Sequence, residues 1–199
     1  MSSGGANVGS GAIILVRHGR PALSRKVMLS AEDYRAWWAR YEIGGLRPGQ
    51  TAPEDLKAHA RQAGAVFAST RLRSIETAQL VCEGRAFVSD PALIEAPLPP
   101  PPLPAWLRLP PIVWGFVSRF NWWWFNYHAG EESRRQAEAR AESMAAQLID
   151  QASGGKEVLV LAHGFFNLMI ARVLKRRGWR LTENGGFKYW GARRFEKRM

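Results

Sequence analysis

Cysteine is almost absent from this sequence: Cys82 is the single cysteine among 199 residues. An internal disulfide is therefore excluded. The composition fits a reducing compartment, so we expect a cytoplasmic protein, with the inner surface of a membrane as an alternative location. Cys82 falls on the apolar face of an expected helix and is interpreted as a core residue.

Long apolar runs are also missing. No stretch approaches the roughly 18 apolar residues that a membrane-spanning helix needs. Residues 1–11 are rich in glycine and serine and lack the basic and apolar regions of a secretory signal, so we interpret them as a flexible leader. Because 46% of the residues are hydrophobic, residues 12–199 are expected to form a single α/β domain.

Acidic residues are scarce, with 17 Asp and Glu against 28 Lys and Arg and a formal net charge of +11. This balance favours anionic partners, such as phosphorylated substrates, nucleic acid or an acidic membrane surface, and does not choose among them. The four histidines and one cysteine show no spacing typical of a metal site. We therefore expect no metal and no other cofactor.

The most informative stretch begins at Ile13, where four apolar residues precede Arg17, His18 and Gly19. The apolar run predicts a short buried strand, and ligands of α/β proteins bind just beyond the carboxyl ends of strands. A neutral imidazole at such a place can attack phosphorus, while a neighbouring arginine holds the phosphoryl oxygens. The structural alternative for His18 is a strand-end histidine that is hydrogen-bonded to a loop.

A second strand tip repeats this chemistry. Residues 158–162 predict a buried strand that ends in His163, and residues 165–174 predict an apolar helix. The amino terminus of a helix favours anions, and His163 lies just before one. Two histidines are thus expected at strand tips.

A third strand, over residues 65–68, leads into a helix that Ser69 or Thr70 is expected to cap. Arg71 and Arg73 lie in the first turn of this helix, where cations oppose the helix dipole. Either a bound anion offsets them or they lie on a solvated surface.

Other elements are expected from their caps and periodicity. Ser30 with Asp33 predicts a helix start, and residues 131–151 form the clearest amphipathic pattern. Residues 186–189 suggest a last edge strand, and the basic residues 193–198 are interpreted as a solvated end.

The oddest segment is rich in proline and tryptophan, and we interpret it as an insertion in the domain at about residues 97–128. Proline dominates the beginning of 97–128, and aromatic residues crowd 106–127. Three interpretations fit the aromatic part: a lid packed over the strand tips, a membrane-interface patch and a self-association surface.

Taken in order, these motifs resemble the histidine phosphatase superfamily, which includes phosphoglycerate mutases and many phosphatases. The resemblance is carried by residues 15–19, Ser69 with Arg73 and Thr77, Glu95, and residues 161–164. It covers about residues 12–174 and combines several independent motifs. The implied fold is phosphoglycerate mutase-like: an α/β three-layer sandwich whose central mixed, mostly parallel sheet is flanked by helices.

The resemblance also implies roles for individual residues. His18 is similar to the nucleophile that becomes phosphohistidine, while Arg17, Arg73 and His163 resemble the pocket for the phosphoryl group. Glu95 resembles the proton donor to the leaving oxygen, although prolines replace the glycine and tryptophan that often follow it. Positioning and charge stabilisation dominate phosphoryl transfer, so these residues could act without a metal.

The expected function is therefore a metal-independent phosphohydrolase that acts on a phosphate monoester. Two alternatives stay open: a phosphoglycerate mutase-like phosphotransferase, and a non-catalytic module that binds phosphate or an anionic membrane. The expected partner is a phosphorylated small molecule, including a lipid-linked one, and not nucleic acid. Residues 106–127 are the candidate for peripheral membrane contact, and the oligomeric state stays open.

Overall fold

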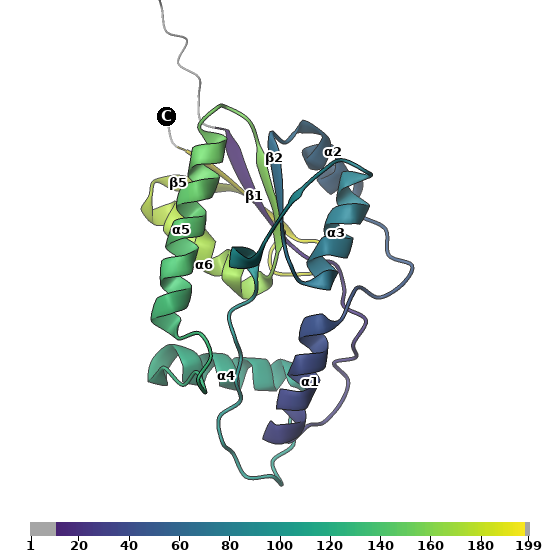
Figure 1. Cartoon of the computed structure of the whole chain (residues 1–199), viewed down its shortest axis with the longest axis vertical. Coiled ribbons are helices and arrows are strands. Elements are labelled where there is room, and N and C mark those ends of the chain that lie inside the picture. The colour runs from purple at the N-terminus through teal and green to yellow at the C-terminus, as the bar shows by residue number, and fades with distance from the viewer. Residues whose placement is uncertain (1–10, 198–199) are drawn as a thin grey trace, which may run out of the picture.

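A six-stranded sheet with the order β3-β2-β4-β1-β6-β5 lies at the centre of the computed structural model, which describes residues 11–197 (Figure 1). The first four strands along the sheet pair in parallel, and β6 is antiparallel to both of its neighbours. The expected mixed, mostly parallel sheet is confirmed. The strands are β1 (Ala12–Arg17), β2 (Ala65–Ser69), β3 (Val88–Asp90), β4 (Val158–Ala162), β5 (Trp179–Asn184) and β6 (Ala192–Lys197).

Helices cover both faces of the sheet. On one face lie α2 (Glu54–Gln62) and α3 (Leu72–Cys82), and on the other lie α5 (Arg134–Ala152) and α6 (Gly164–Arg176). Alternate residues of β1 serve the two layers: Ile14 and Val16 pack with α2 and α3, whereas Ile13 and Leu15 pack with α5 and α6. Burial on both faces explains why β1 and β4 are continuous apolar runs. The three-layer sandwich is confirmed.

Capping residues explain where the helices begin. Ser30 and Asp33 form the expected capping box at α1 (Ala31–Ile43). A second capping box, of Ser133 and Gln136, starts α5 three residues later than the sequence pattern suggests. Helix α3 has no side-chain cap, because its N-cap is Arg71. The prediction that Ser69 or Thr70 caps this helix is wrong.

A third apolar cluster lies outside the three layers, where α1 packs against α4 (Pro111–Phe125) at the lower end of Figure 1. Tyr34, Trp37 and Tyr41 of α1 and Trp114 of α4 are buried there. Residues 94–110, which connect the sandwich to α4, contain no helix or strand, as their prolines predict. We call α1, α4 and this connection the aromatic cap.

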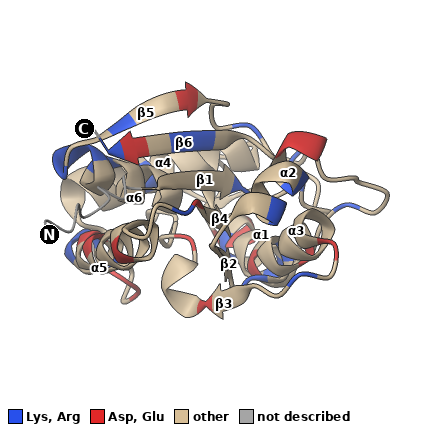
Figure 2. Cartoon of the chain, turned by 90° about the horizontal axis from the view of Figure 1, so that it is seen from above, with Lys and Arg blue, Asp and Glu red and all other residues tan. Residues whose placement is uncertain are grey.

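The carboxyl-terminal part differs from expectation. Residues 186–189 form no strand, and residues 193–197 of the supposed solvated end belong to β6, which pairs with β1 and β5. Arg198 lies outside the described residues. The alternation of apolar and charged residues along β6 explains the error. Phe195 is completely buried, while Arg194 pairs with Glu157 and Glu196. Charged residues therefore dominate the sequence of a strand inside the sheet, as Figure 2 shows.

Residues 1–10 of the expected leader lie outside the described residues. Gly11, placed in the leader by composition, is buried, and its N–H donates to the carbonyl of Ala152 at 2.8 Å. None of the helices within residues 11–197 is long and apolar enough to cross a membrane.

Candidate active site

Adjacent parallel strands bring two histidines together. His18 follows β1 and His163 follows β4, and the centroids of their rings lie 5.2 Å apart in an edge-on arrangement. The backbone N–H of His18 donates to the carbonyl of Ala162 at 2.9 Å, which extends the ladder between the strands by one bond. Both rings are buried at the carboxyl ends of the strands, where the sequence placed the site.

The hydrogen bonding of His18 fixes its tautomer. Its Nδ1 lies 2.7 Å from the carbonyl oxygen of Gly19, and because a carbonyl only accepts, Nδ1 carries the proton. The lone pair is therefore on Nε2. Burial, with the nearby charges of Arg73 and Arg17, lowers the pKa of His18 well below its usual 6.5. The ring is neutral at physiological pH and keeps its nucleophilic form.

Gly19 is required by close packing. A Cβ at this position would lie 2.4 Å from the ring of Trp190, so a larger residue would force either that ring or the turn that holds His18 to move. The N–H of Gly19 donates to Thr77 Oγ1 at 3.0 Å, and Thr77 in turn donates to the carbonyl of Arg73 at 2.6 Å. The histidine turn is thus tied to the first turns of α3.

Arg73 has no exposed surface. Its guanidinium donates to the carbonyl of Tyr41 at 2.9 Å, to the carboxylate of Glu42 at 2.7 Å and to Nδ1 of His163 at 3.3 Å. Arg71 lies 2.8 Å from the same carboxylate. The anion that offsets the two arginines at the start of α3 is therefore Glu42, at the end of α1.

His163 uses both ring nitrogens inside the protein. Because arginine can only donate, Nδ1 of His163 accepts from Arg73, and Nε2 carries a proton that it donates to Ser69 Oγ at 2.9 Å. Burial and the charge of Arg73 lower the pKa of His163 well below its usual value. His163 is thus a neutral donor beside His18.

Arg17 lies on the other side of His18. Its Nη1 donates to the carbonyl of Phe187 at 2.6 Å, and its guanidinium carbon lies 4.3 Å from the centre of the Tyr189 ring. Tyr189 also packs beside His18, with ring centroids 5.8 Å apart. The loop before β6, which the sequence suggested as a strand, therefore covers one side of the site.

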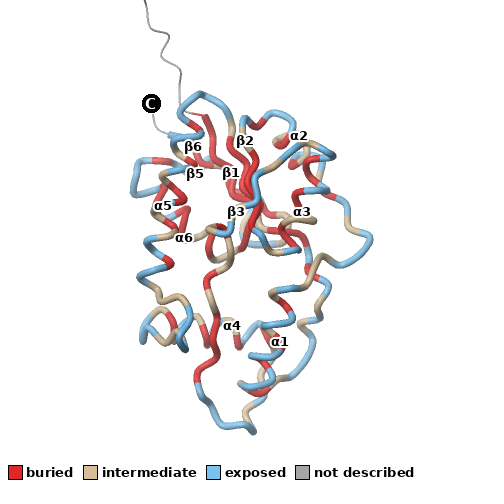
Figure 3. Tube along the Cα trace, in the orientation of Figure 1, coloured by how far each residue is buried: buried red, intermediate tan, exposed pale blue. Residues whose placement is uncertain are grey.

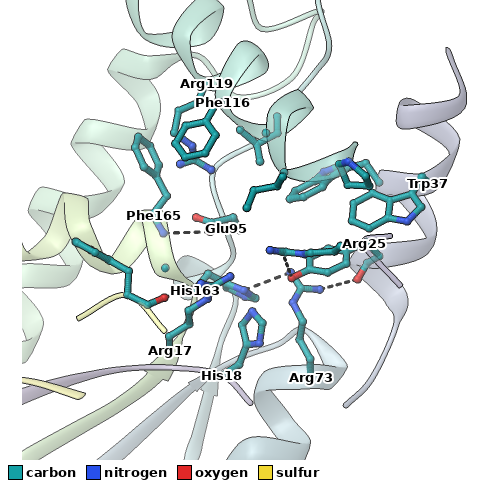
Figure 4. A pocket seen from close by; sticks show the side chains of 18 of the residues that line it. Arg17, His18, Arg25, Trp37, Arg73, Glu95, Phe116, Arg119, His163 and Phe165 are labelled. Carbon is teal, nitrogen blue, oxygen red and sulfur yellow. Dashed lines mark hydrogen bonds between the residues drawn. The ribbon is translucent and has the colours of Figure 1, made fainter. Parts of the chain in front are cut away.

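Glu95 joins the site despite the prolines that follow it. It comes after the short 3-10 helix η1 (Pro91–Leu93). Its two carboxylate oxygens accept the backbone N–H groups of Phe165 at 3.2 Å and Phe166 at 2.8 Å. These donors are at the amino terminus of α6, so Glu95 caps this helix and is held rigidly (Figure 4).

One cavity of about 370 Å³ connects these groups. All five residues with expected roles, Arg17, His18, Arg73, Glu95 and His163, line it. The aromatic cap supplies the opposite wall, which includes Trp37 and Phe116 (Figure 4). Of the three interpretations of the aromatic segment, the lid over the strand tips agrees with the position of this wall.

A family model described as "Histidine phosphatase superfamily (branch 1)" matches residues 13–186. The chain belongs to the histidine phosphatase superfamily. A search of curated proteins found no match.

Solved structures of the superfamily's phosphatases and mutases share the fold. A phosphoserine phosphatase from Entamoeba histolytica with bound phosphoserine is 14% identical, has a TM-score of 0.60, and aligns over 94% of this chain and 91% of that one. A mycobacterial glucosyl-3-phosphoglycerate phosphatase is 20% identical, with a TM-score of 0.54 and coverage of 84% and 80%. A phosphoglycerate mutase from Bacillus anthracis is 16% identical, with a TM-score of 0.50 and coverage of 95% and 89%. The expected phosphoglycerate mutase-like fold is confirmed.

Two charged residues of this superfamily member had no role in the sequence interpretation. Glu42 ends a helix whose other charges are solvated, and nothing in its sequence neighbourhood points to Arg73. Arg119 of α4 lines the cavity, with its guanidinium carbon 3.4 Å from the centre of the Phe165 ring. Burial lowers the pKa of Arg119 to about 10, so it remains a cation at neutral pH.

Proposed function

We propose that the protein is a phosphohydrolase that cleaves phosphate monoesters through a phosphohistidine at His18. The observation that carries this proposal is the set of unpaired donors around the cavity. Arg17 Nε, Arg73 Nε and Arg119 Nη1 are buried and have no hydrogen-bond partner within residues 11–197. An unsatisfied buried donor costs about 1–3 kcal/mol, and more when it is charged. A phosphoryl group bound beside the neutral His18 would offset that cost.

In the proposed first step, Nε2 of His18 attacks the phosphorus and the bond to the leaving oxygen breaks. Glu95 in its acid form gives that oxygen a proton, so the product leaves as an alcohol. Arg17 and Arg73 neutralise the charge that spreads over the phosphoryl oxygens in the transition state. The products of the step are the alcohol and phosphohistidine, with Glu95 left as a carboxylate.

In the second step, water attacks the phosphorus and the bond between phosphorus and Nε2 breaks. Glu95 accepts a proton from the water, which restores its acid form as inorganic phosphate leaves. We assign to His163 a bond to one phosphoryl oxygen, for which its Nε2–H turns from Ser69 towards the cavity. The 5.2 Å between the two ring centroids is short enough for one phosphoryl group to contact both histidines.

The arginines supply the charge stabilisation in this proposal, and no metal is needed. Within residues 11–197, no three or more His, Cys, Asp or Glu side chains are grouped so that they could hold a metal ion. Because the arginines would supply the positive charge, we expect turnover to be unchanged by a chelator.

An assay with 4-nitrophenyl phosphate tests the reaction type. We expect inorganic phosphate and nitrophenolate in equal amounts, also when an acceptor alcohol is added. Phosphate transferred to the alcohol in place of water would identify a phosphotransferase, and tight phosphate binding without turnover would identify a binding module. His59→Ala is the matched control for His18→Ala, because His59 pairs with Glu157 outside the cavity and its loss should leave turnover intact.

A further inference from the structure

Exposed apolar side chains gather on the aromatic cap. Fifteen large hydrophobic side chains are exposed within residues 11–197, and ten of them belong to α4 or to the two segments beside it. Along α4, Ile112, Phe116, Phe120 and Trp124 follow one another every four residues and are 55–72% exposed. The connection before α4 adds Trp106, which is 80% exposed, and it forms the exposed lower end of the molecule in Figure 3.

A second segment extends this surface. Leu29 and Leu109 exchange two backbone hydrogen bonds, of 3.0 and 2.9 Å, which bring the exposed Val27 and Met28 beside the start of α4. We call the exposed side chains of Val27, Met28, Trp106, and α4 the apolar face. An apolar surface of this kind on a soluble domain marks an interaction site.

The apolar face and the cavity share a border. Ile112 and Phe116 are exposed and also line the cavity, so its mouth opens among these apolar side chains. The cavity has Arg17, Arg73 and the two histidines on the side of the strand tips, and aromatic and aliphatic side chains with Arg119 among them on the side of the cap. Its two ends fit a molecule with a phosphate at one end and an apolar group at the other.

The charges identify what this face contacts. Residues 97–130 contain no acidic residue, and the whole chain has a formal net charge of +11. The exposed cations at this face are Lys26, next to Val27, and Arg108, which lies 3.9 Å from Asp33. Two copies of this chain would repel each other, and a second copy placed here would cover the mouth of the cavity. An anionic lipid surface complements both the charge and the mixture of tryptophan, phenylalanine and arginine.

We infer that the apolar face docks the protein on an anionic lipid bilayer and that the cavity receives the headgroup of a phosphorylated lipid from it. The docking is inferred from the exposed side chains alone. The choice of substrate also rests on the proposed phosphohydrolase function. The phosphate reaches His18 while the acyl chain stays beside Ile112 and Phe116, at the mouth.

Vesicle flotation tests the docking. Phosphatidylcholine vesicles with and without phosphatidylglycerol are mixed with the wild type and with Phe120→Glu/Trp124→Glu. These two residues are exposed and do not line the cavity. The control is Leu80→Glu/Val88→Glu, which adds the same charge at exposed positions away from the cap. We expect the wild type and the control to float with the anionic vesicles at least tenfold more than with the neutral ones, and to be released by salt. The cap variant should stay in solution.

Other outcomes overturn the docking. The first is a wild type that fails to float, and the second is a cap variant that floats as well as the control. The third is a wild type that is dimeric and a cap variant that is monomeric, which would assign the face to a second copy. His18→Ala should float like the wild type. Flotation without turnover of any monoester would leave the docking intact and reject the proposed function.

A series of alkyl phosphates tests the substrate class. Lengthening the alkyl chain should raise kcat/KM by up to fourfold for each methylene that the mouth buries, roughly what burial of a methylene group provides. The cap variant should hydrolyse 4-nitrophenyl phosphate at the wild-type rate and lose turnover of phosphatidic acid in vesicles. A kcat/KM that does not change with chain length would reject an amphipathic substrate.

Discussion

Glu42 holds Arg73: one carboxylate oxygen of Glu42 lies 2.7 Å from Nη2 of an arginine that has no exposed surface. The same guanidinium group donates to Nδ1 of His163. The end of α1 in the aromatic cap therefore sets the orientation of a histidine at the tip of β4. This contact joins the cap to the proposed phosphoryl pocket.

Removing the charge of Glu42 should destabilise the protein, because Arg73 depends on it for a counter-ion. Glu42→Gln leaves a buried cation without its counter-ion, and we expect the free energy of unfolding to fall by about 3 kcal/mol. Excess inorganic phosphate should restore part of the loss, because it binds only the folded state. Urea unfolding with and without phosphate measures both effects.

Glu138→Gln is the matched control, since its pair with Arg134 is exposed and should contribute less than about 1 kcal/mol. Equal losses in the two variants would show that Glu42 is only a surface partner.

The two buried histidines should make stability fall in mild acid. The folded-state pKa of each lies well below the usual 6.5, so above pH 6.5 neither the folded nor the unfolded chain binds these protons. Below it only the unfolded chain does, until the pH reaches the folded-state pKa. Within that window the loss approaches about 1.4 kcal/mol per pH unit for each histidine.

Urea unfolding at pH 7.5, 6.5 and 5.5 would show this dependence, and His18→Ala should reduce the slope by about half. A stability that stays constant over this range would mean that the two rings bind protons in the folded chain at the same pH as in the unfolded chain.

Arg119 should contribute to anion binding and oppose folding. Its Nη1 is buried without a partner within the described residues, so Arg119→Gln should leave the free protein at least as stable as the wild type. Loss of one charged donor should weaken inhibition by inorganic phosphate by about 10–100-fold. Arg135→Gln, at an exposed position on α5, is the control. An unchanged inhibition constant would place Arg119 outside the anion site.

Glu95 is assigned here as the proton donor, and leaving-group chemistry tests it. A nitrophenolate leaves with little protonation, whereas an alkoxide needs a proton. Glu95→Gln should therefore slow alkyl phosphates by about 10²–10⁴-fold and nitrophenyl phosphate much less. Equal losses would make Glu95 only the cap of α6. No loss on either substrate would transfer the role to another acid.

The strand tips could be predicted from sequence because local patterns determine them. Apolar runs that end in His18 and His163 belong to strands buried on both faces, and parallel strands present such ends at one edge of the sheet. Arg73 could be chosen over Arg71 only through its spacing to Thr77 in the family motif, and the structure places Arg73 in the cavity wall.

What the sequence missed depends on contacts between distant segments. Glu42 meets Arg73 across 31 residues of sequence, and no local pattern records that pair. β6 was missed because most of its residues are charged. Phe195 points into the core, whereas its neighbour Arg194 forms ion pairs with Glu157 and Glu196. Arg119 was overlooked because an arginine among aromatic residues is compatible with both a solvated face and a cavity wall.

The phosphohistidine is the central claim, and rapid quenching with substrate labelled in its phosphoryl group tests it most directly. The protein should carry a label that is stable in alkali and lost in acid, as phosphohistidine is, and peptide mapping should locate it at His18. His18→Ala should fold normally, lose turnover by many powers of ten and take up no label. Turnover in His18→Ala close to that of the wild type, or a label at another residue, would contradict the account.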